Sequence, residues 1–404
     1  MTRVVVTGIG VVSPLGHCTP VFTRGLVEGR CAIAPLTIPR AETLNARVAA
    51  EVTGFDPASH FSERELLQMD RVAQFAVFAA REAVSQSGLH FDGLLSERTA
   101  AIVGTGVGGQ NTQEDSYDRL HAEPPRRLHP LVVPRLMTSS VASHISMQFA
   151  LRGPAFAVTS ACASGAHAVG MAFQMVRAGA IDCAVTGGVD ACITHATLRG
   201  WEALRVLAPD LCRPFSRDRK GLVLGEGAAM FVLESLESAR ARGAAILGEI
   251  AGFGMTADAR DLLSPDESGA ARAIEAALAD ARVAPEDVDY INAHGTGTII
   301  NDETETAVIK RVFGDHARRI PVSSIKSMIG HALGAASALE IVATLHAAAT
   351  DVVPPTINFL GPDPACDLDY VPNESRSVLV RAAVTNSFAF GGLNAVLVVR
   401  KFAG

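Results

Sequence analysis

The sequence has 404 residues, of which 48% are hydrophobic and 19% are charged, a composition typical of a folded globular protein. Its length allows either two domains or one duplicated unit with a large core. The formal net charge of -7 gives no indication of binding to nucleic acid or to an anionic membrane.

The cysteines show no C-x-x-C pair and no Cys/His spacing typical of a metal site; they are Cys18, Cys31, Cys162, Cys183, Cys192, Cys212 and Cys366. Their odd number predicts reduced thiols in a cytoplasmic protein. Residues 1–10 begin a strand pattern directly, so we expect no signal peptide. No apolar run is expected to reach the roughly 18 residues that a membrane span needs.

The first part of the chain alternates strand and helix patterns. We expect strands at 4–10, 100–104, 156–162, 182–188 and 227–234, the one ending at residue 162 being buried. Helices are expected at 70–87, 134–151, from Cys162 to about residue 178, and at 235–242. The segments 20–65, 110–135 and 199–220 read as loops or irregular structure.

A glycine-rich segment at residues 104–109, Gly-Thr-Gly-Val-Gly-Gly, is the one feature that suggests a dinucleotide site. A dinucleotide-binding turn requires a helix directly after the glycines and an acidic partner for the ribose. The sequence indicates neither, so we do not expect nucleotide binding here.

The order of elements repeats from residue 247. Strands are expected at 247–255, 288–294, 320–324, 378–387 and 395–400, and helices at 268–281 and 330–349. This order predicts a duplicated α/β unit with halves at 1–246 and 247–404, the first half carrying Cys162. Sites in such a protein gather near strand ends, at the junction of the halves.

Cys162 is expected at a turn between a strand and a helix rich in small residues. Unpaired backbone N–H groups and the positive end of the helix dipole favour the thiolate there, and the thiolate is the nucleophilic form. The alternative is that this cysteine is simply a small buried apolar residue.

Three polar residues of the second half are expected to meet Cys162. His294 precedes a tight Gly-Thr-Gly-Thr turn, and Lys326 and His331 flank the helix start that the duplication pairs with the Cys162 turn. A thiolate can accept an acyl group as a thioester, and two imidazoles can donate N–H groups to the carbonyl of a second thioester. Such donors support the enolate formed when a malonyl group loses its carboxylate. Zinc binding fits poorly because the candidate ligands lack short spacings.

Four motifs carry a family resemblance: Ser-Ala-Cys-Ala-Ser-Gly at 160–165, His-Gly-Thr-Gly-Thr at 294–298, Lys-Ser-Met-Ile-Gly-His at 326–331, and Asn-Ser-Phe-Ala-Phe-Gly-Gly at 386–392. Their order resembles that of the β-ketoacyl-[acyl-carrier-protein] synthases over essentially the whole chain. The Cys-His-His set is similar to types I and II, and unlike type III enzymes or thiolases. Residues 213–215 and 353–358 are most similar to the type II elongating enzymes.

The resemblance implies a thiolase-like fold, a duplicated five-layer α-β-α-β-α arrangement that is usually a homodimer, with no cofactor or metal. It implies that Cys162 accepts an acyl chain from a carrier protein, and that His294 and His331 assist decarboxylation of a malonyl-carrier protein. The backbone N–H groups of Cys162 and Phe390 correspond to the oxyanion hole of the family. Lys326 matches a residue that orders the site; Glu340 matches one that pairs with this lysine or with a backbone turn. Their alternative role is a structural ion pair.

The same resemblance places a gating loop around Phe390, whose alternative role is core packing. Ala389 replaces the glycine usual in this loop, which restricts backbone movement. Leu393 replaces a usual threonine, and Leu263 replaces a polar residue of a second gate loop. We therefore expect the gate to move differently in this chain.

The acyl-tail pocket and the docking surface are also assigned from the resemblance. Leu131 and Val132, with Val107 close by, replace a bulkier lining, which favours a longer, stiffer or polyunsaturated chain. Carrier proteins are acidic, so a basic patch is expected. Its candidates are Arg126 and Arg127, with Arg64 and Arg205 as weaker ones.

The leading hypothesis is an elongating condensing enzyme of fatty-acid synthesis or of a specialised pathway, such as polyene, polyketide or nodulation-signal synthesis. The alternative is a partner subunit that determines chain length beside an active synthase. Cys162 and both histidines argue against this alternative, although a heterodimer with such a partner stays open. A thiolase is disfavoured because no second cysteine lies near residues 386–392.

Overall fold

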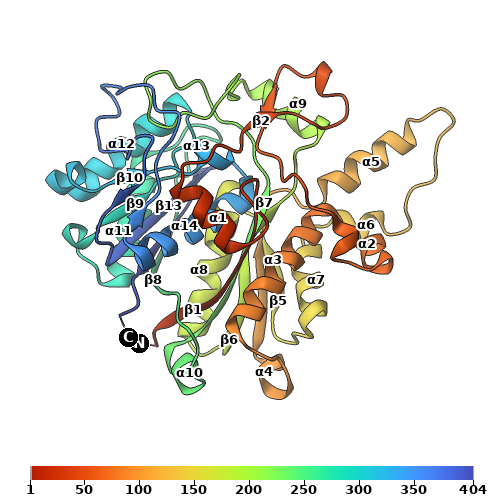
Figure 1. The fold of residues 1–404 in the computed structure, drawn as a ribbon, viewed down its shortest axis with the longest axis horizontal. Helices are drawn as coiled ribbons and strands as arrows, with labels where there is room; N and C mark the ends of the chain where they lie inside the picture. Colours follow the sequence, from red (N-terminus) through yellow and green to blue (C-terminus); the bar gives the residue numbers. More distant parts are fainter. Residues whose placement is uncertain (1, 404) are drawn as a thin grey trace.

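The computed structural model describes residues 2–403, which form one mixed ten-stranded sheet with helices on both faces (Figure 1). The strands of the first half are β1 (Val4–Val12), β4 (Thr99–Gly104), β5 (Ala155–Val158), β6 (Cys183–Asp190) and β7 (Gly227–Ser235). Those of the second half are β8 (Gly248–Ala257), β9 (Tyr290–Asn292), β10 (Val322–Ser323), β13 (Ala382–Ala389) and β14 (Leu393–Arg400). Two short ladders, β2 (Ala34–Pro35) with β3 (Val48–Ala49) and β11 (Val352–Val353) with β12 (Arg376–Ser377), lie outside this sheet.

The sheet consists of two half-sheets with equivalent strand orders. The order β5-β4-β6-β7-β1 in the first half is repeated as β10-β9-β13-β14-β8 in the second. The two half-sheets are joined where β1 pairs antiparallel with β8 at Val4–Ile250, Val5–Glu249 and Val6–Gly248. The predicted duplication of the α/β unit is therefore confirmed.

The two half-sheets form two layers of the protein, and helices form the other three. α8 (Ser164–Arg177) and α14 (Ala336–Thr350) contact each other and strands of both half-sheets, so they form the central layer. α3 (Arg71–Ser87) and α7 (Ser140–Phe149) cover the first half-sheet, and α11 (Glu267–Ala281), with α12 (Ile299–Phe313) against it, covers the second. This is the predicted five-layer, thiolase-like arrangement.

Small residues allow α8 and α14 to approach closely. A side chain at Gly165 would place its Cβ 2.9 Å from the Gly334 carbonyl oxygen, so only glycine fits there. α14 is buried along nearly its whole length. The segment Leu333–Thr350 meets the length and hydropathy criteria for a membrane span, contrary to the expectation from the sequence, but 83% of it is buried inside the protein. A core helix satisfies the same criteria.

Several helices lie where loops were expected; they are α1 (Thr19–Val27), α2 (Glu63–Gln68), α5 (Gln110–Leu120) and α9 (His195–Leu204). α6 (Val132–Leu136) begins in an expected loop and overlaps the start of the expected helix 134–151. Pro20 stands in the first turn of α1, a position that starts a helix rather than breaking one. α5 buries only Thr112 and Ser116, so it has no apolar periodicity to detect. The remaining helices are α4 (Gly93–Glu97), α10 (Leu236–Ala241) and α13 (Lys326–Ile329).

The strand before Cys162 is not buried, contrary to expectation. β5 lies at one edge of the sheet, is exposed at Ala155 and is only partly buried as far as Val158. The helix expected at residues 134–151 is divided into α6 and α7, with an extended residue, Met137, between them. A strand at the edge of a sheet can contain apolar residues that are exposed in a single chain. In the sequence these residues look the same as those of a buried strand.

Candidate active site

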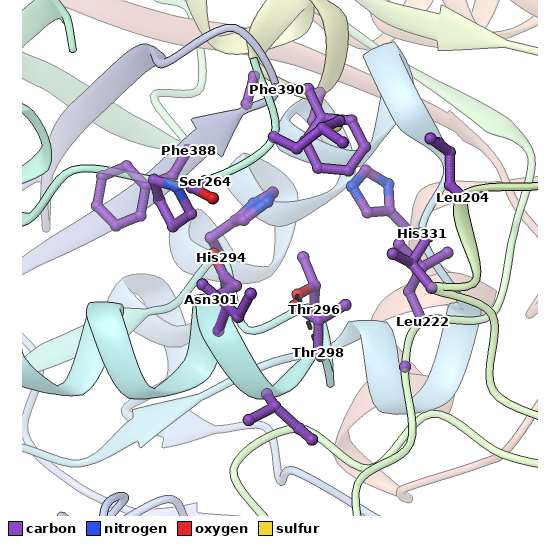
Figure 2. A pocket seen from close by; sticks show the side chains of 18 of the residues that line it. Leu204, Leu222, Ser264, His294, Thr296, Thr298, Asn301, His331, Phe388 and Phe390 are labelled. Atoms are coloured by element: carbon purple, nitrogen blue, oxygen red, sulfur yellow. Dashed lines mark hydrogen bonds between the residues drawn. The ribbon is translucent and has the colours of Figure 1, made fainter. Parts of the chain in front are cut away.

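A cavity of about 570 Å³ lies where the two halves meet, and Cys162, His294 and His331 line it. Figure 2 shows the side chains of His294, His331 and Phe390 turned toward one another within it. Most of the remaining lining is apolar: Trp201, Leu204, Leu222, Leu262, Leu263, Ile299, Ile300 and Phe388. Of the four residues expected to converge, Cys162, His294 and His331 therefore meet in the cavity, and Lys326 lies behind its lining, beside His294.

Cys162 lies in a 3-10 turn, Ala161–Ala163, between β5 and α8. Ala161 has a left-handed backbone with φ of 49°, a strained conformation for a residue other than glycine. The second half has an equivalent 3-10 turn, Leu333–Ala335, before α14, and its first residue has φ of 46°. Both halves therefore use the same strained entry into a central helix.

The surroundings of Cys162 favour the thiol, not the thiolate that the helix start was expected to favour. Burial raises its pKa to about 11, although the Lys326 charge and the backbone N–H groups of Phe390 and Cys162 lower it. Cys162 is only 6% exposed, so loss of hydration outweighs the favourable dipoles. The thiol has to lose its proton as it reacts.

His294 and His331 lie beside each other, with ring centroids 5.6 Å apart and ring planes at 86°. Both are buried, and burial together with the nearby Lys326 charge lowers the pKa of each well below its ordinary value. Both imidazoles are therefore neutral at physiological pH.

Hydrogen bonds determine which nitrogen of each ring carries the proton. The Leu333 N–H donates to His331 Nδ1 at 3.0 Å, so this nitrogen is an acceptor. The Lys326 ammonium lies 3.4 Å from His294 Nδ1 and can only donate, so this nitrogen is an acceptor as well. A neutral imidazole with an accepting Nδ1 carries its proton on Nε2. Each ring therefore has one free Nε2–H donor.

Lys326 is buried and uses its ammonium entirely within the protein. It donates to the His294 carbonyl oxygen at 2.6 Å and forms an ion pair with Glu340, which is equally buried. Burial raises the pKa of Glu340 to about 7, although Lys326 lowers it. The pairing that the sequence left open for Glu340 is thus with Lys326.

Two buried carboxylates near the histidines were not identified from the sequence. Glu305 in α12 accepts the backbone N–H groups of His294 and Gly295 at 2.8 and 2.7 Å. Asp190 ends β6 and accepts the Gly334 N–H at 2.6 Å, three residues after His331. Each therefore fixes a turn that carries one histidine. An acidic residue at the end of a buried strand, as in Gly-Gly-Val-Asp, was the available signal for Asp190.

Asp190 also explains the glycine-rich segment at residues 104–109. α5 does begin directly after Gly109, so the expectation that no helix follows was wrong. The Gly106 N–H and the Thr105 hydroxyl donate to Asp190 at 2.8 Å each. These donors would have to hold the phosphates of a dinucleotide, and a protein carboxylate already occupies them.

The predicted gating loop is the turn between β13 and β14. Gly391 and Gly392 have φ of 83° and 66°, and the Gly391 N–H donates to the Leu262 carbonyl oxygen at 2.8 Å. The preceding residue, Phe390, turns its N–H toward Cys162 and stacks on Trp201. Ala389 pairs with Leu393 as the last pair of the ladder, so both belong to regular strand structure.

Only some of the residues predicted for the gate, the acyl pocket and the docking surface lie at the cavity. Leu263 and Ala389 line the cavity, whereas Leu393, Val107, Leu131 and Val132 are not among its lining residues. Of the arginines suggested for docking, Arg205 lies at the cavity, together with Lys220. Arg64, Arg126 and Arg127 are exposed elsewhere, the last two on the long loop that projects after α5 in Figure 1. Among residues 2–403, no group of His, Cys, Asp and Glu side chains is arranged to hold a metal ion.

Family models and curated relatives that match this chain all point to the same family. The family model described as "Beta-ketoacyl synthase, N-terminal domain" matches residues 1–239, and the one described as "Beta-ketoacyl synthase, C-terminal domain" matches residues 247–360. The chain is 50% identical over 399 residues to "Nodulation protein E" of a Rhizobium species, and 99% of each chain is aligned. It is 42% identical to "3-oxoacyl-[acyl-carrier-protein] synthase 2" of a Synechocystis species, covering 99% of this chain and 98% of that one.

Among solved structures, "The ishigamide ketosynthase/chain length factor" superposes with a TM-score of 0.95 at 40% identity, covering 100% of both chains. The similarity extends over the whole length, so it includes both half-sheets and the central helices.

Proposed function

The chain belongs to the beta-ketoacyl synthase family of condensing enzymes, and from this premise we propose a residue-by-residue mechanism for its site. Cys162 accepts an acyl group from a carrier protein, and a malonyl group on a second carrier protein is then condensed with it. The product is a β-ketoacyl thioester two carbons longer, with carbon dioxide released. The observation that carries this proposal is the pair of buried imidazoles beside Cys162, each with its Nδ1 in contact with a donor, which leaves each Nε2–H available to a substrate.

In the first step the Cys162 sulfur attacks the thioester carbonyl of the acyl-carrier protein. The N–H groups of Cys162 and Phe390, which already face the sulfur, stabilise the oxyanion as the carbonyl oxygen gains charge. The S–C bond to the carrier breaks as the new one forms, and the thiol proton of Cys162 goes to the departing carrier thiolate. Because the pKa of the thiol is about 11, proton transfer accompanies the attack rather than preceding it.

In the second step the malonyl thioester carbonyl accepts both Nε2–H groups, from His294 and His331. The bond to the carboxylate breaks, carbon dioxide leaves, and the electron pair forms an enolate held by the two donors. Its carbon attacks the acyl thioester on Cys162, and the cysteine leaves as a thiolate that takes up a proton from water, which replaces the proton lost to the first carrier protein. Lys326 supports this step by keeping both rings neutral and by fixing the tautomer of His294.

The experiment that tests this proposal is mass spectrometry of the carrier-bound products formed from malonyl-carrier protein and acyl primers of different length. We expect β-ketoacyl products from the unaltered chain and none from Cys162→Ala. The Cys162→Gln variant should still release carbon dioxide from malonyl-carrier protein, because both histidines are intact. The exposed Cys31 provides the matched control, Cys31→Ala, which should keep full activity. Condensation by Cys162→Ala would refute the mechanism.

For the pathway, we propose a specialised acyl chain rather than primary fatty-acid synthesis. The higher identity to a nodulation protein than to a 3-oxoacyl synthase supports this choice. The apolar replacements Leu263 and Ala389 at the cavity support it too, since they alter the surface that an acyl chain meets. The same product analysis decides between these pathways through the chain length that reacts fastest.

For the partners, we propose acyl- and malonyl-carrier proteins and a second subunit of the same kind, in the cytoplasm. Arg205 and Lys220 at the cavity suit an acidic carrier protein. The edge strand β5 has one unpaired side and is contacted by α7. The segment before α7 exposes large apolar residues: Leu128, Leu131, Val133 and Met137. Such an edge is suited to pairing with another chain. Leu131 and Val132 lie on this surface, so they would border an acyl pocket only when a second subunit covers it.

A homodimer is the proposed assembly because Cys162 and both histidines are present in this chain, so it needs no active partner. Light scattering of the purified chain tests this: a monomer that becomes active only with a second, different subunit would favour the heterodimer.

A further inference from the structure

The peptide bond between Ala161 and Cys162 carries one of the two proposed oxyanion donors, the N–H of Cys162. The carbonyl oxygen of the same peptide, on Ala161, accepts the Ser164 hydroxyl at 2.6 Å. Ser164 is fully buried, and its hydroxyl oxygen also accepts the Ser160 N–H at 2.9 Å. In a planar trans peptide the C=O and the N–H point in opposite directions, so a bond that holds the carbonyl also aims the N–H. The Ser164 hydroxyl therefore fixes the direction of a donor that it does not touch.

A histidine of the same helix, α8, holds Ser160. His167 Nδ1 lies 2.9 Å from the Ser160 hydroxyl oxygen and 3.2 Å from the Ala163 carbonyl oxygen. A carbonyl oxygen can only accept, so the contact with Ala163 favours the tautomer with the proton on Nδ1, which then donates to both oxygens. Phe253 of β8 packs edge-on against the His167 ring, with centroids 6.1 Å apart. Ser160, Ser164 and His167 thus form one hydrogen-bonded network around the turn that carries the nucleophile.

The second half of the chain provides an internal comparison. Its turn Leu333–Ala335 runs directly into α14, just as Ala161–Ala163 runs directly into α8, so the two segments align without a gap. In this alignment the three network residues correspond to apolar ones: Ser160 to Ala332, Ser164 to Ala336 and His167 to Leu339. The two turns nevertheless share almost the same backbone, with φ of 49° at Ala161 and 46° at Leu333. The turn therefore forms without the polar network.

The middle residues of the two turns use their N–H groups differently. In the second half this residue is Gly334, whose N–H donates to the Asp190 carboxylate at 2.6 Å. In the first half it is Cys162, whose N–H faces its own sulfur. A carboxylate bound to that N–H would occupy the donor that a substrate oxyanion needs, so the first turn has to be held from its carbonyl side instead. The network thus belongs to the half in which the N–H has to stay free.

We propose that Ser164 is a positioning residue that aims the Cys162 N–H at the oxyanion formed during acylation. His167 keeps the Ser164 hydroxyl in place through Ser160. The bond to the Ala161 carbonyl also strengthens the donor, because a hydrogen bond to one end of a peptide polarises the other end. This inference rests on the proposed acylation of Cys162.

The chemistry of acylation determines which rate constant Ser164 affects. The Cys162 sulfur bonds to the acyl carbon, and the sulfur of the carrier or pantetheine leaves with the thiol proton. The carbonyl oxygen carries a negative charge only between these two events. Ser164 therefore acts on the transition state and not on substrate binding, so its loss should lower kcat and leave KM unchanged.

Two reactions of the same thiol test this role in the full-length protein. The first is acylation by acetyl, hexanoyl or dodecanoyl pantetheine, which passes through an oxyanion. The second is alkylation by iodoacetamide, in which the sulfur attacks a saturated carbon and no oxyanion forms. Peptide mass spectrometry measures both adducts on Cys162 and separates them from those on the exposed Cys31.

Ser164→Ala should slow acylation and leave alkylation unchanged. Loss of an oxyanion donor costs about 10²- to 10³-fold in rate, and loss of the group that aims it should lower kcat by a smaller factor, roughly 10- to 10²-fold. His167→Leu introduces the residue found at the equivalent place in α14, and it should slow acylation by a smaller factor than Ser164→Ala. The alanine at position 336 shows that such a turn forms without a hydroxyl, so we expect Ser164→Ala to fold. Circular dichroism verifies folding, and His167→Leu decides if Ser164→Ala does not fold.

Ser116→Ala is the matched control. Ser116 of α5 is buried and donates to the Thr112 carbonyl oxygen at the same distance of 2.6 Å, but it is not among the residues that line the cavity. Its loss removes the same kind of hydrogen bond, so both reactions of Cys162 should keep their rates.

The outcomes separate the two proposals. Slower acylation with unchanged alkylation supports the positioning role. Equal slowing of both reactions would mean that Ser164 only holds the sulfur in place, and unchanged acylation would mean that its hydroxyl has no role; either result overturns the inference and leaves the proposed function intact. Failure of all three thioesters to acylate Cys162 in the unaltered chain overturns the proposed function and this inference together.

Discussion

Replacing Lys326 with methionine tests the electrostatic account of the site. Methionine has nearly the same length, so the change removes the charge without leaving a large cavity. It leaves the buried Glu340 carboxylate without its partner, and one oxygen of that carboxylate, Oε2, already has none. Breaking a buried ion pair from one side costs about 3–5 kcal/mol, because an uncompensated charge remains. We expect the free energy of unfolding to fall by this amount.

The same substitution should impair decarboxylation. His294 Nδ1 loses the ammonium that fixes its tautomer, and the pKa of both imidazoles rises because the Lys326 charge lowers it in the unaltered protein. Loss of one oriented donor costs roughly 10²- to 10³-fold in rate. The assay is carbon dioxide release from malonyl-carrier protein in the Cys162→Gln background, which isolates this step from acyl transfer.

A double variant separates the effects on stability and rate. Lys326→Met combined with Glu340→Gln removes the uncompensated carboxylate, so most of the lost stability should return while decarboxylation stays slow. Urea unfolding followed by circular dichroism measures the stability of each variant. A single variant within about 1 kcal/mol of the unaltered chain, below the range expected for a buried pair, would refute the electrostatic reasoning. A double variant no more stable than the single one would show that Glu340 is not the charge responsible.

Three further predictions follow from the site. Ala389→Gly should change relative turnover across acyl-chain lengths by freeing the turn before Phe390, and identical rates for all lengths would contradict a gating role. Arg205→Glu should raise KM for carrier-bound but not for pantetheine-bound substrates. Arg126→Glu, on the projecting loop, should raise it less. An equal rise in KM for both variants would place carrier docking on the projecting loop. Burial raises the pKa of Asp190 to about 6, so the folded state binds its proton more tightly than the unfolded chain does. The stabilisation from protonated Asp190 is fully present below the pKa that this residue has in the unfolded chain. It is lost, by an amount on the order of 3 kcal/mol, as the pH rises through about 6. Asp190→Asn should flatten urea-unfolding stability over this range, and an unchanged pH slope would argue against the assignment.

The duplicated architecture was predictable because each half repeats the same apolar runs in the same order. Strands such as β1 and β7 are buried along nearly their whole length, so their sequences identify them without any neighbour. The polar helix α5 was not predictable, because its two buried residues give no periodic signal. The edge position of β5 was missed for a related reason: its apolar residues resemble those of a core strand.

The residues proposed as catalytic could be selected from the sequence because each lies in a short motif beside a turn. Asp190 and Glu305 could not, since their role depends on hydrogen bonds to backbone that the sequence does not localise. Asp190 reaches Gly334 across 144 positions of the chain. The ionisation of Cys162 was wrongly anticipated because burial is set by the whole fold, whereas the helix dipole is a local property. The Trp201–Phe390 stack likewise joins residues from opposite halves.

The two strained turns before α8 and α14 have a consequence for how this fold divides its work. Ala161 and Leu333 hold the same left-handed backbone, which costs on the order of 1–3 kcal/mol at each position, although only one of the two turns carries a nucleophile. The strain therefore belongs to the repeated unit and not to the chemistry of either half. In the proposed mechanism, one half displays the group that becomes covalently loaded, and the other displays the donors that activate the incoming unit. Neither half has a complete site, so catalytic activity reports that both copies of the unit have folded against each other.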